Sequence, residues 1–334
     1  MRSREKVRFA VLGCGVISEF HIEAIVKLEE TELVAICDVS EEYMKKYTDQ
    51  YSVRTYTDYD ELLSQDDIDV VCICTPSGMH PEQTIKAAKA GKHVICEKPM
   101  ALKIEDTYRM IEMCEQNEVK LAAVFPWRMS PVVQYVREFI QGGGLGKLSL
   151  CSAYIKPFRK QAYYDKAGWR GTWAIDGGGV LMNQGIHTVD MLQWIAGPVA
   201  SCYGQIGAVL RNIEVEDTAI SLLNFKNGAM GVIEASTTAY KTPDSLTFHG
   251  ENGTLILSSG EITKLELVEG EVEIPIFEAF KVIPDGHRLQ IRDMALAIRE
   301  DREPIVTGRD GIQSLEIILG TYESSRNQRK KMMS

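Results

Sequence analysis

Two groups of polar residues in this sequence are of types that transfer protons. One is Lys98, near the end of the strand-like run 93–99. The other is Asn183, His187 and Asp190, which recur at i, i+4 and i+7 in an apolar segment and would form one stripe on a buried helix. An imidazole or amine beside a reacting atom can act as a general acid or base. The residues alone also allow a hydrogen-bonded structural histidine and a solvated lysine.

A glycine-containing loop follows the first strand-like run, 7–13, and leads into a helical pattern. That context makes Gly13-Cys14-Gly15-Val16-Ile17-Ser18 a candidate dinucleotide-binding fingerprint. The first glycine permits a tight turn, the second lets the backbone approach a pyrophosphate, and a small third residue lets the helix pack closely. We expect Gly13, Gly15, Val16 and Ile17 to bind the pyrophosphate at the helix N-terminus. The alternative is that the glycines only make a turn.

An acidic residue ends the second strand-like run. Asp38 stands where a carboxylate accepts hydrogen bonds from an adenosine ribose. The same carboxylate would repel a 2′-phosphate, and Val39, not an arginine, follows it. We therefore expect NAD as the cofactor, with NADP disfavoured. The alternative is that Asp38 only caps a helix.

The elements that must position these residues change character along the chain. Continuously apolar runs alternate with helical stretches up to about residue 125, which predicts a parallel sheet covered on both faces. Long strand-like segments joined by short turns such as 226–228 and 251–253 then predict antiparallel pairing. We expect an α/β protein with a Rossmann domain over 1–125. An α+β substrate-binding and oligomerisation domain with an open-faced, mostly antiparallel sheet follows over 126–334, and its final helical segment can pack back on the first domain.

Composition limits the partners of the chain. Its 334 residues carry a net charge of −10, which would repel a phosphate backbone, so we expect no nucleic acid. No apolar run reaches the ~20 residues that span a bilayer, and no secretory signal pattern is present. The eight cysteines form no C-x-x-C pair and are interpreted as reduced core thiols of a cytoplasmic protein. We expect no metal, because the scattered acidic and histidine residues lack ligand spacing.

Several motifs together resemble the Gfo/Idh/MocA oxidoreductases, which include glucose-fructose oxidoreductase and inositol dehydrogenase. They are the glycine loop, the segment 75–80, Glu97-Lys98-Pro99, and the triple glycine 177–179 followed by Asn183 and His187. The resemblance covers nearly the whole chain. It implies a Rossmann domain followed by an open-faced sheet, with a nicotinamide at their junction.

The same resemblance assigns roles to individual residues. It implies that Lys98 and His187 flank the reacting carbon, and that Glu97 and the Thr75-Pro76 turn contact the nicotinamide half. Inositol dehydrogenase-like members carry an aspartate at the position of Asn183, so the proton relay differs here.

The remaining histidines carry weaker signals. His80, after the Thr-Pro turn, could line the cofactor cleft or be structural. We interpret His21 as structural and find no motif around His287, apart from its place at the start of a helix near the end of the chain.

Aromatic residues next to arginine mark a candidate substrate segment over 163–173. Trp169, Arg170 and Trp173 would suit a polyhydroxylated ring and an anionic group, and Trp127-Arg128 are further candidates. The alternative is that these aromatics only pack a long loop.

These interpretations combine into one predicted function with two alternatives. We expect an NAD-dependent oxidoreductase that transfers hydride between nicotinamide and a hydroxyl-bearing carbon of a sugar, cyclitol or nucleotide sugar. The alternatives are a non-catalytic dinucleotide-binding regulator and an NAD-dependent glycoside hydrolase. Apolar residues on both alternations of the late strands predict a homodimer or homotetramer.

Overall fold

The computed structural model describes residues 6–166 and 168–333, which form two compact units. The first unit consists of residues up to Pro126 together with Lys281–Gly311. The second unit consists of Trp127–Phe280 and the residues from Ile312 onward. The second unit is thus interrupted in sequence by a segment that packs with the first.

The first unit contains a six-stranded parallel sheet in the order β3-β2-β1-β4-β5-β6, so the expected Rossmann-type sheet is confirmed. Its central strands are buried on both faces, which explains why their sequences are continuously apolar. The strands are β1 (Val7–Leu12), β2 (Thr31–Cys37), β3 (Arg54–Tyr56), β4 (Val70–Ile73), β5 (His93–Cys96) and β6 (Leu121–Ala123).

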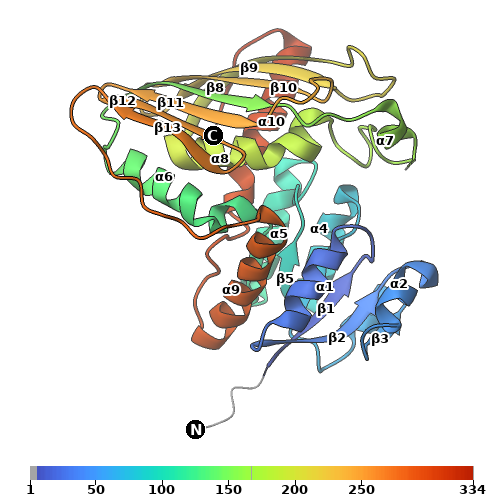
Figure 1. Ribbon diagram of the computed structural model, residues 1–334. Coiled ribbons are helices and arrows are strands. Elements are labelled where there is room, and N and C mark those ends of the chain that lie inside the picture. Colours follow the sequence, from blue (N-terminus) through green and yellow to red (C-terminus); the bar gives the residue numbers. More distant parts are fainter. Residues whose placement is uncertain (1–5, 167, 334) are drawn as a thin grey trace. The chain divides into compact units, whose positions relative to one another are not determined.

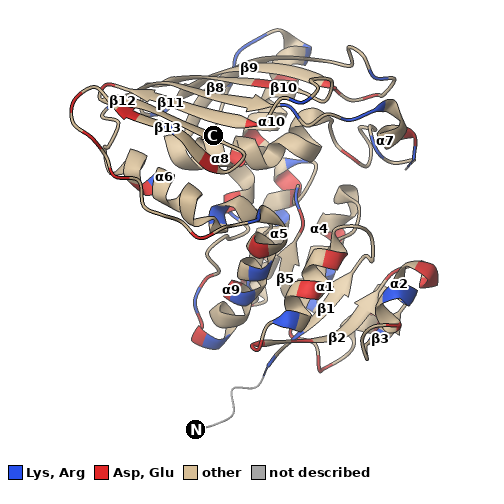
Figure 2. Cartoon of the chain, viewed as in Figure 1, with Lys and Arg blue, Asp and Glu red and all other residues tan. Residues whose placement is uncertain are grey.

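Helices of this unit complete its core. They are α1 (Ser18–Lys27), α2 (Glu41–Thr48), α3 (Tyr59–Leu63), α4 (His80–Lys89), α5 (Ile104–Gln116) and α9 (His287–Glu300). Helix α9 lies beside α1 (Figure 1), and its Ile291, Met294 and Ala295 share a buried cluster with Ile22 and Ile25 of α1. Burial of this apolar face groups residues 281–311 with the first unit. Charged residues of both signs lie along α1, α2 and α9 (Figure 2).

The second unit is built on an eight-stranded sheet in the order β13-β12-β11-β7-β10-β9-β8-β14. Strands β7 and β10 are parallel and the other described pairs are antiparallel, so the expected mostly antiparallel sheet is confirmed. The strands are β7 (Leu148–Ile155), β8 (Val199–Gly207), β9 (Thr218–Phe225), β10 (Met230–Ser236), β11 (Ser245–Gly250), β12 (Gly253–Ser258), β13 (Glu261–Leu267) and β14 (Lys331–Met332).

Helices complete the second unit. They are α6 (Pro131–Gln141), α7 (Gln161–Asp165), α8 (Ile186–Ala196) and α10 (Asp310–Asn327), and a π-helical turn, Val180–Gly185, leads directly into α8. Helix α8 packs on β7 and β11. Along β9, Leu223 is buried whereas Ile220 and Leu222 are 51% and 55% exposed, so an apolar face stays open. Within 6–166 and 168–333, no helix is long and apolar enough to cross a membrane.

Candidate active site

The glycine loop of the first unit has the geometry that a pyrophosphate requires. Gly13 has a φ of +89°, and a Cβ there would lie 2.9 Å from the Cys74 carbonyl, so only glycine fits. A Cβ at Gly15 would meet nothing within 4 Å, which leaves open space in front of its backbone. Val16 is 76% exposed just before α1 begins. The loop therefore fits an anion at a helix N-terminus.

Ser18, the residue that replaces the third small residue of the fingerprint, is fully buried. Its hydroxyl donates to the Gly15 carbonyl over 2.7 Å and lies 3.0 Å from the Tyr47 hydroxyl. The departure from glycine or alanine thus adds a hydrogen bond that closes the loop.

Asp38 lies beside this loop at the end of β2. Its two carboxylate oxygens accept hydrogen bonds from the backbone N–H groups of Cys14, at 2.7 Å, and Ser40, at 2.8 Å. The residue is half-buried. This position suits contact with a ribose hydroxyl.

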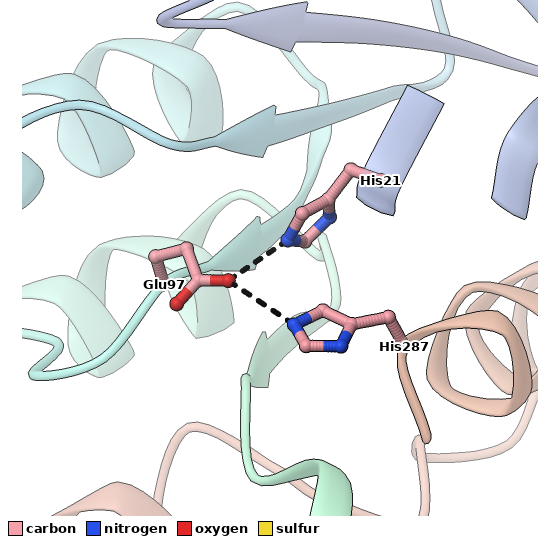
Figure 3. Close-up of side chains that lie close together, drawn as sticks. All are labelled: His21, Glu97 and His287. Atoms are coloured by element: carbon pink, nitrogen blue, oxygen red, sulfur yellow. Dashed lines mark hydrogen bonds and ion pairs between the residues drawn. The ribbon is translucent and has the colours of Figure 1, made fainter. Parts of the chain in front are cut away.

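Glu97 directly follows β5 and lies close to two buried histidines (Figure 3). Its Oε1 atom lies 2.9 Å from Nε2 of His21, on α1, and 3.7 Å from Nε2 of His287, at the start of α9. Its Oε2 atom accepts the backbone N–H of Lys98 over 3.1 Å. The candidate ligand atoms of the three side chains all lie within 4.8 Å of one another. Neither Nδ1 atom has a described hydrogen-bond partner, unlike the histidines of most metal sites.

The pKa shifts in this group favour an ionised Glu97 and a neutral His21. Burial opposes ionisation of Glu97, but the hydrogen bonds from His21 and His287 hold the pKa of its carboxyl well below the ordinary value. Burial lowers the pKa of His21 despite its bond to Glu97. The arrangement is an ionised carboxylate held by imidazole N–H groups, directly before Lys98.

His80, an expected cofactor contact, is 1% exposed and has a different role. Its Nδ1 and Nε2 atoms lie 2.8 Å from the carbonyl oxygens of Pro99 and Thr75, respectively. The ring therefore joins the turn that follows β4 to the turn that follows β5. His80 therefore links the Thr75-Pro76 and Lys98-Pro99 turns from a buried position.

In the second unit, the polar stripe lies where the helix begins. Asn183, in the π-helical turn, donates its side-chain N–H to Asp176 over 2.8 Å, and Asp176 also accepts the backbone N–H of Gly171. His187 lies one turn further on, in α8, and is half-buried like Asn183. A π-helical turn inside a helix frequently marks a functional position. The turn thus brings Asn183 and Asp176 together before His187.

Asp190, the last member of the stripe, is paired with Arg128. The guanidinium donates to both carboxylate oxygens at 2.7 and 2.8 Å, and Arg128 is 2% exposed. Arg128 also stacks on Trp194. This buried bidentate pair argues against Arg128 as a substrate contact. Trp127 packs beneath Gly260, where a Cβ would come within 2.2 Å of the indole, so it too has a packing role.

The aromatic segment contributes a cluster near the π-helical turn. The Arg170 guanidinium lies over the rings of Tyr163, at 4.3 Å, and Trp169, at 5.4 Å. The Tyr163 hydroxyl accepts a hydrogen bond from Gln184, the neighbour of Asn183. Trp173 packs separately, edge-on to Tyr322 and below Arg326. Residue 167, within this expected segment, lies outside the described residues.

Two further arginines extend this cluster. Arg159 lies over Tyr163 at 5.2 Å, and Arg211 lies over Phe158 at 5.7 Å. Arg211 also donates to the Arg159 carbonyl over 2.9 Å. Three guanidinium groups on aromatic rings offer N–H donors suited to an anionic ligand.

Several contributing residues carried no motif. His21 and His287 meet Glu97 only because α9 packs beside α1, and Asp176 meets Asn183 only in the folded turn. The carboxylate of Glu216 accepts the backbone N–H groups of Gly179 and Leu181 at the start of the π-helical turn. The sequence offered one signal for Glu216: it forms an acidic pair with Asp217 directly before the apolar strand β9.

Comparison with known proteins agrees with this geometry. Residues 7–125 match the model of the Gfo/Idh/MocA oxidoreductases described as an oxidoreductase family with an NAD-binding Rossmann fold. Residues 137–333 match the C-terminal alpha/beta domain of the same family.

Individual relatives cover almost the whole chain. The WlbA dehydrogenase from Bordetella pertussis, solved in complex with NADH and UDP-GlcNAcA, is 35% identical, with a TM-score of 0.91 and 99% of each chain covered. The myo-inositol 2-dehydrogenase of Thermotoga maritima is 27% identical over 97% of each chain. The scyllo-inositol 2-dehydrogenase (NAD(+)) of Bacillus subtilis is 26% identical over 96% of this chain and 95% of its own.

Proposed function

Because the chain belongs to the Gfo/Idh/MocA family of NAD-binding oxidoreductases, we propose that it oxidises a hydroxyl group of a nucleotide-linked sugar acid. The observation that carries this choice is the cluster of Arg159, Arg170 and Arg211 on aromatic rings, close to the turn that contains Asn183. A neutral cyclitol offers no anionic group to such a cluster. The Bordetella enzyme that contains UDP-GlcNAcA supports the same substrate class.

The proposed chemistry divides between proton and hydride. His187 accepts the proton of the substrate hydroxyl and Lys98 assists, while Asn183 orients the substrate or the imidazole. NAD, when bound, supplies the acceptor for the hydride that leaves the same carbon. The substrate carbon becomes a carbonyl, and the products are NADH and one proton. Gly13, Gly15, Val16, Ile17 and Asp38 bind the adenosine half of the cofactor, and Thr75, Pro76 and Glu97 lie toward its nicotinamide half.

Arg170 provides the test of the substrate class. Its guanidinium lies over the rings of Tyr163 and Trp169 in a half-buried side chain, and we expect it to bind the anionic group of the substrate. We expect NADH formation from NAD with UDP-GlcNAcA, and little with myo-inositol. Arg170→Gln should raise KM for UDP-GlcNAcA by about 10-fold or more, since a charge-assisted bond contributes ~1.5–3 kcal/mol. Arg137→Gln is the control, because Arg137 also stacks on a tryptophan, Trp194, but lies outside the cluster. Turnover of inositol with no response to UDP-GlcNAcA would contradict the proposed substrate.

A cyclitol dehydrogenase is the second candidate. Two inositol dehydrogenases favour it, because they are similar to this chain over 97% and 96% of its length. A non-catalytic regulator or an NAD-dependent glycoside hydrolase has less support. Both Lys98 and His187 are present, and relatives are named as dehydrogenases. The same substrate panel separates these possibilities, because a regulator would bind NAD without turnover.

We also propose a homodimer or homotetramer that forms through the open face of the second sheet. Tyr203 on β8 and Leu222 on β9 are paired neighbours on this face, at 45% and 55% exposure. Leu150 and Met230, paired on β7 and β10, extend it at 41% and 62%. These exposed apolar side chains on one face of the sheet favour a protein partner there. The eight cysteines are all free and buried, which supports a location in the reducing cytoplasm.

A further inference from the structure

Glu216 binds the start of the helical segment that carries Asn183 and His187. Its carboxylate accepts the backbone N–H groups of Gly179, at 2.8 Å, and Leu181, at 3.0 Å. Its own backbone carbonyl accepts the N–H of Val180, between them, at 3.0 Å. One residue, 1% exposed, therefore satisfies three consecutive N–H groups at a helix start, where such groups have no partner within the helix.

Tyr322 of α10 completes this arrangement. Its hydroxyl donates to the Glu216 carboxylate over 2.8 Å, and its ring is buried against the edge of Trp173. The carboxylate thus accepts three donors with two oxygens. Its negative charge lies at the positive end of the helix dipole, which is a favourable position.

Two of the three glycines are explained by the close approach of these two residues. A Cβ at Gly178 would lie 2.2 Å from the Tyr322 hydroxyl oxygen. A Cβ at Gly179 would lie 1.7 Å from the Glu216 carbonyl oxygen. Neither position can carry a side chain while Glu216 and Tyr322 stay in contact with the turn. The glycines, the carboxylate and the phenol therefore form one fitted unit.

The helix start determines where the polar stripe points. The backbone N–H of Asn183 donates to the Gly179 carbonyl over 2.9 Å. Gly179 in turn donates its own N–H to the Glu216 carboxylate, so Asn183 is connected to Glu216 through one residue. His187 follows one turn later on the same segment. A shift of the helix start would move both side chains together, and small misplacements of reacting groups lower rates strongly.

We propose that Glu216 and Tyr322 are positioning residues, which act by fixing the helix start that presents Asn183 and His187. The consequence for catalysis rests on the proposed function, in which His187 accepts the substrate proton. Neither residue is placed in contact with substrate or cofactor.

Protonation of Glu216 gives this arrangement a measurable signature. Burial raises the pKa of its carboxyl to about 7, while the N–H of Leu181, the Tyr322 hydroxyl and the N–H of Gly179 oppose the increase. Asp176 also acts on this pair: its charge, after burial and the charge of Glu216, raises the pKa of Tyr322. As the pH falls through about 7, the carboxylate gains a proton and loses acceptor capacity toward the two amides.

The direct test follows the amide resonances of Gly179 and Leu181 by NMR as a function of pH, without substrate. We expect both to titrate together with a midpoint near 7. Tyr322→Phe should move that midpoint to higher pH, because it removes a donor that favours the ionised form. Glu216→Gln should abolish the titration. Thr321→Val is the matched control, since it removes a buried hydroxyl of α10 that bonds to Ser221, and it should leave the midpoint unchanged.

Activity supplies the second readout. Glu216→Gln and Tyr322→Phe should lower kcat by about 10- to 100-fold with NAD affinity changed only a few fold. The acidic limb of the kcat profile should move to higher pH in Tyr322→Phe but not in Thr321→Val. Amides that do not titrate, or an unchanged midpoint in Tyr322→Phe, would overturn the proposal. If the Gly179 and Leu181 amides titrate as expected but the wild type turns over no sugar, the result would support the positioning role of Glu216 and Tyr322. It would contradict the proposed reaction instead.

Discussion

The backbone N–H of Cys14 donates a hydrogen bond to the Asp38 carboxylate over 2.7 Å. The loop expected to bind the pyrophosphate and the residue expected to bind ribose are therefore joined by the protein's own hydrogen bond. Such preorganisation lowers the cost of ordering the site on binding.

Cofactor preference follows from this carboxylate. NAD(H) should bind at least about tenfold more tightly than NADP(H), or ~1.4 kcal/mol, because Asp38 would face a 2′-phosphate. Asp38→Ala should narrow the difference and weaken NAD binding. Titration of protein fluorescence measures both affinities. Asp67→Ala, which removes an exposed carboxylate paired with Arg54, is the control and should leave the preference unchanged. Equal affinities for the two cofactors in the wild type would refute the assignment.

The Glu97 group predicts a large effect on stability. Glu97→Gln removes the charged acceptor that two buried imidazole N–H groups face, and a hydrogen bond to a charged group contributes about 1.5–3 kcal/mol to the free energy of unfolding. Because the folded pKa of Glu97 is depressed below 4.5, its contribution is present above that pH and is lost as the pH falls through the folded value. The gap between wild type and variant, measured by denaturant unfolding, should narrow on acidification.

Glu115→Gln provides the comparison for that measurement. Glu115 pairs with Arg309 at the surface, with side chains 57% and 62% exposed, so its loss should cost less than about 1 kcal/mol. Equal losses in the free energy of unfolding for the two variants would show that Glu97 contributes no more to stability than an exposed ion pair does.

The triple glycine predicts intolerance to a single methyl group. Gly179→Ala should destabilise the protein by about 3 kcal/mol, the upper part of the range for overpacking, because the Glu216 carbonyl blocks the added carbon. Gly207→Ala adds the same carbon with only an ordinary contact at 3.6 Å to Val209. Thermal melting compares the two variants. A Gly179→Ala protein as stable as Gly207→Ala would contradict the close approach described here.

Assembly gives an independent prediction. Leu222→Glu places a charge in the centre of the open apolar face and should dissociate the oligomer. Val268→Glu adds a charge at an exposed position just beyond β13, the strand at the edge of the sheet opposite to β8 and β14, and should not. Light scattering at micromolar concentration reports the mass. A monomeric wild type would refute assembly through this sheet.

Asn183 allows a finer test of its role. It already bonds to a carboxylate, that of Asp176, so Asn183→Ala should cost less activity than loss of His187. Asn183→Asp should be tolerated according to the family resemblance, although it would place two carboxylates side by side. Steady-state kinetics with the substrate identified from the panel measures both variants. A larger loss in Asn183→Ala than in His187→Ala would reverse the assigned roles.

Local patterns predicted the fold where burial made the sequence regular. The central strands β1 and β4 are apolar on both faces, and the turns at 226–228 and 251–253 join antiparallel strands as expected. Strand β3 carries no such signal, because its three residues Arg54–Tyr56 are mostly exposed. Strand β13 is likewise largely open to solvent.

The sites were less accessible to local patterns, because their partners are distant in sequence. Arg128 was expected to face substrate, but its partner Asp190 lies on another helix, and only the fold brings the two together. The sequence around His80 allowed either a cofactor contact or a structural role. In the fold, its ring lies between the carbonyl oxygens of Thr75 and Pro99. The relations of Glu97 with His287, and of Glu216 with Tyr322, depend on packing of the last helices.

The most direct test of the central claim is turnover by His187→Ala. With NAD and UDP-GlcNAcA, or whichever substrate the panel identifies, the rate of NADH formation should fall by ~10²–10⁴-fold, the typical effect of losing a general acid or base. Lys98→Met should show a comparable loss. NAD affinity should change only a few fold in both variants, because the Gly13–Ser18 loop and Asp38 are intact. Near-normal turnover in His187→Ala would contradict the account and leave His187 with a structural role.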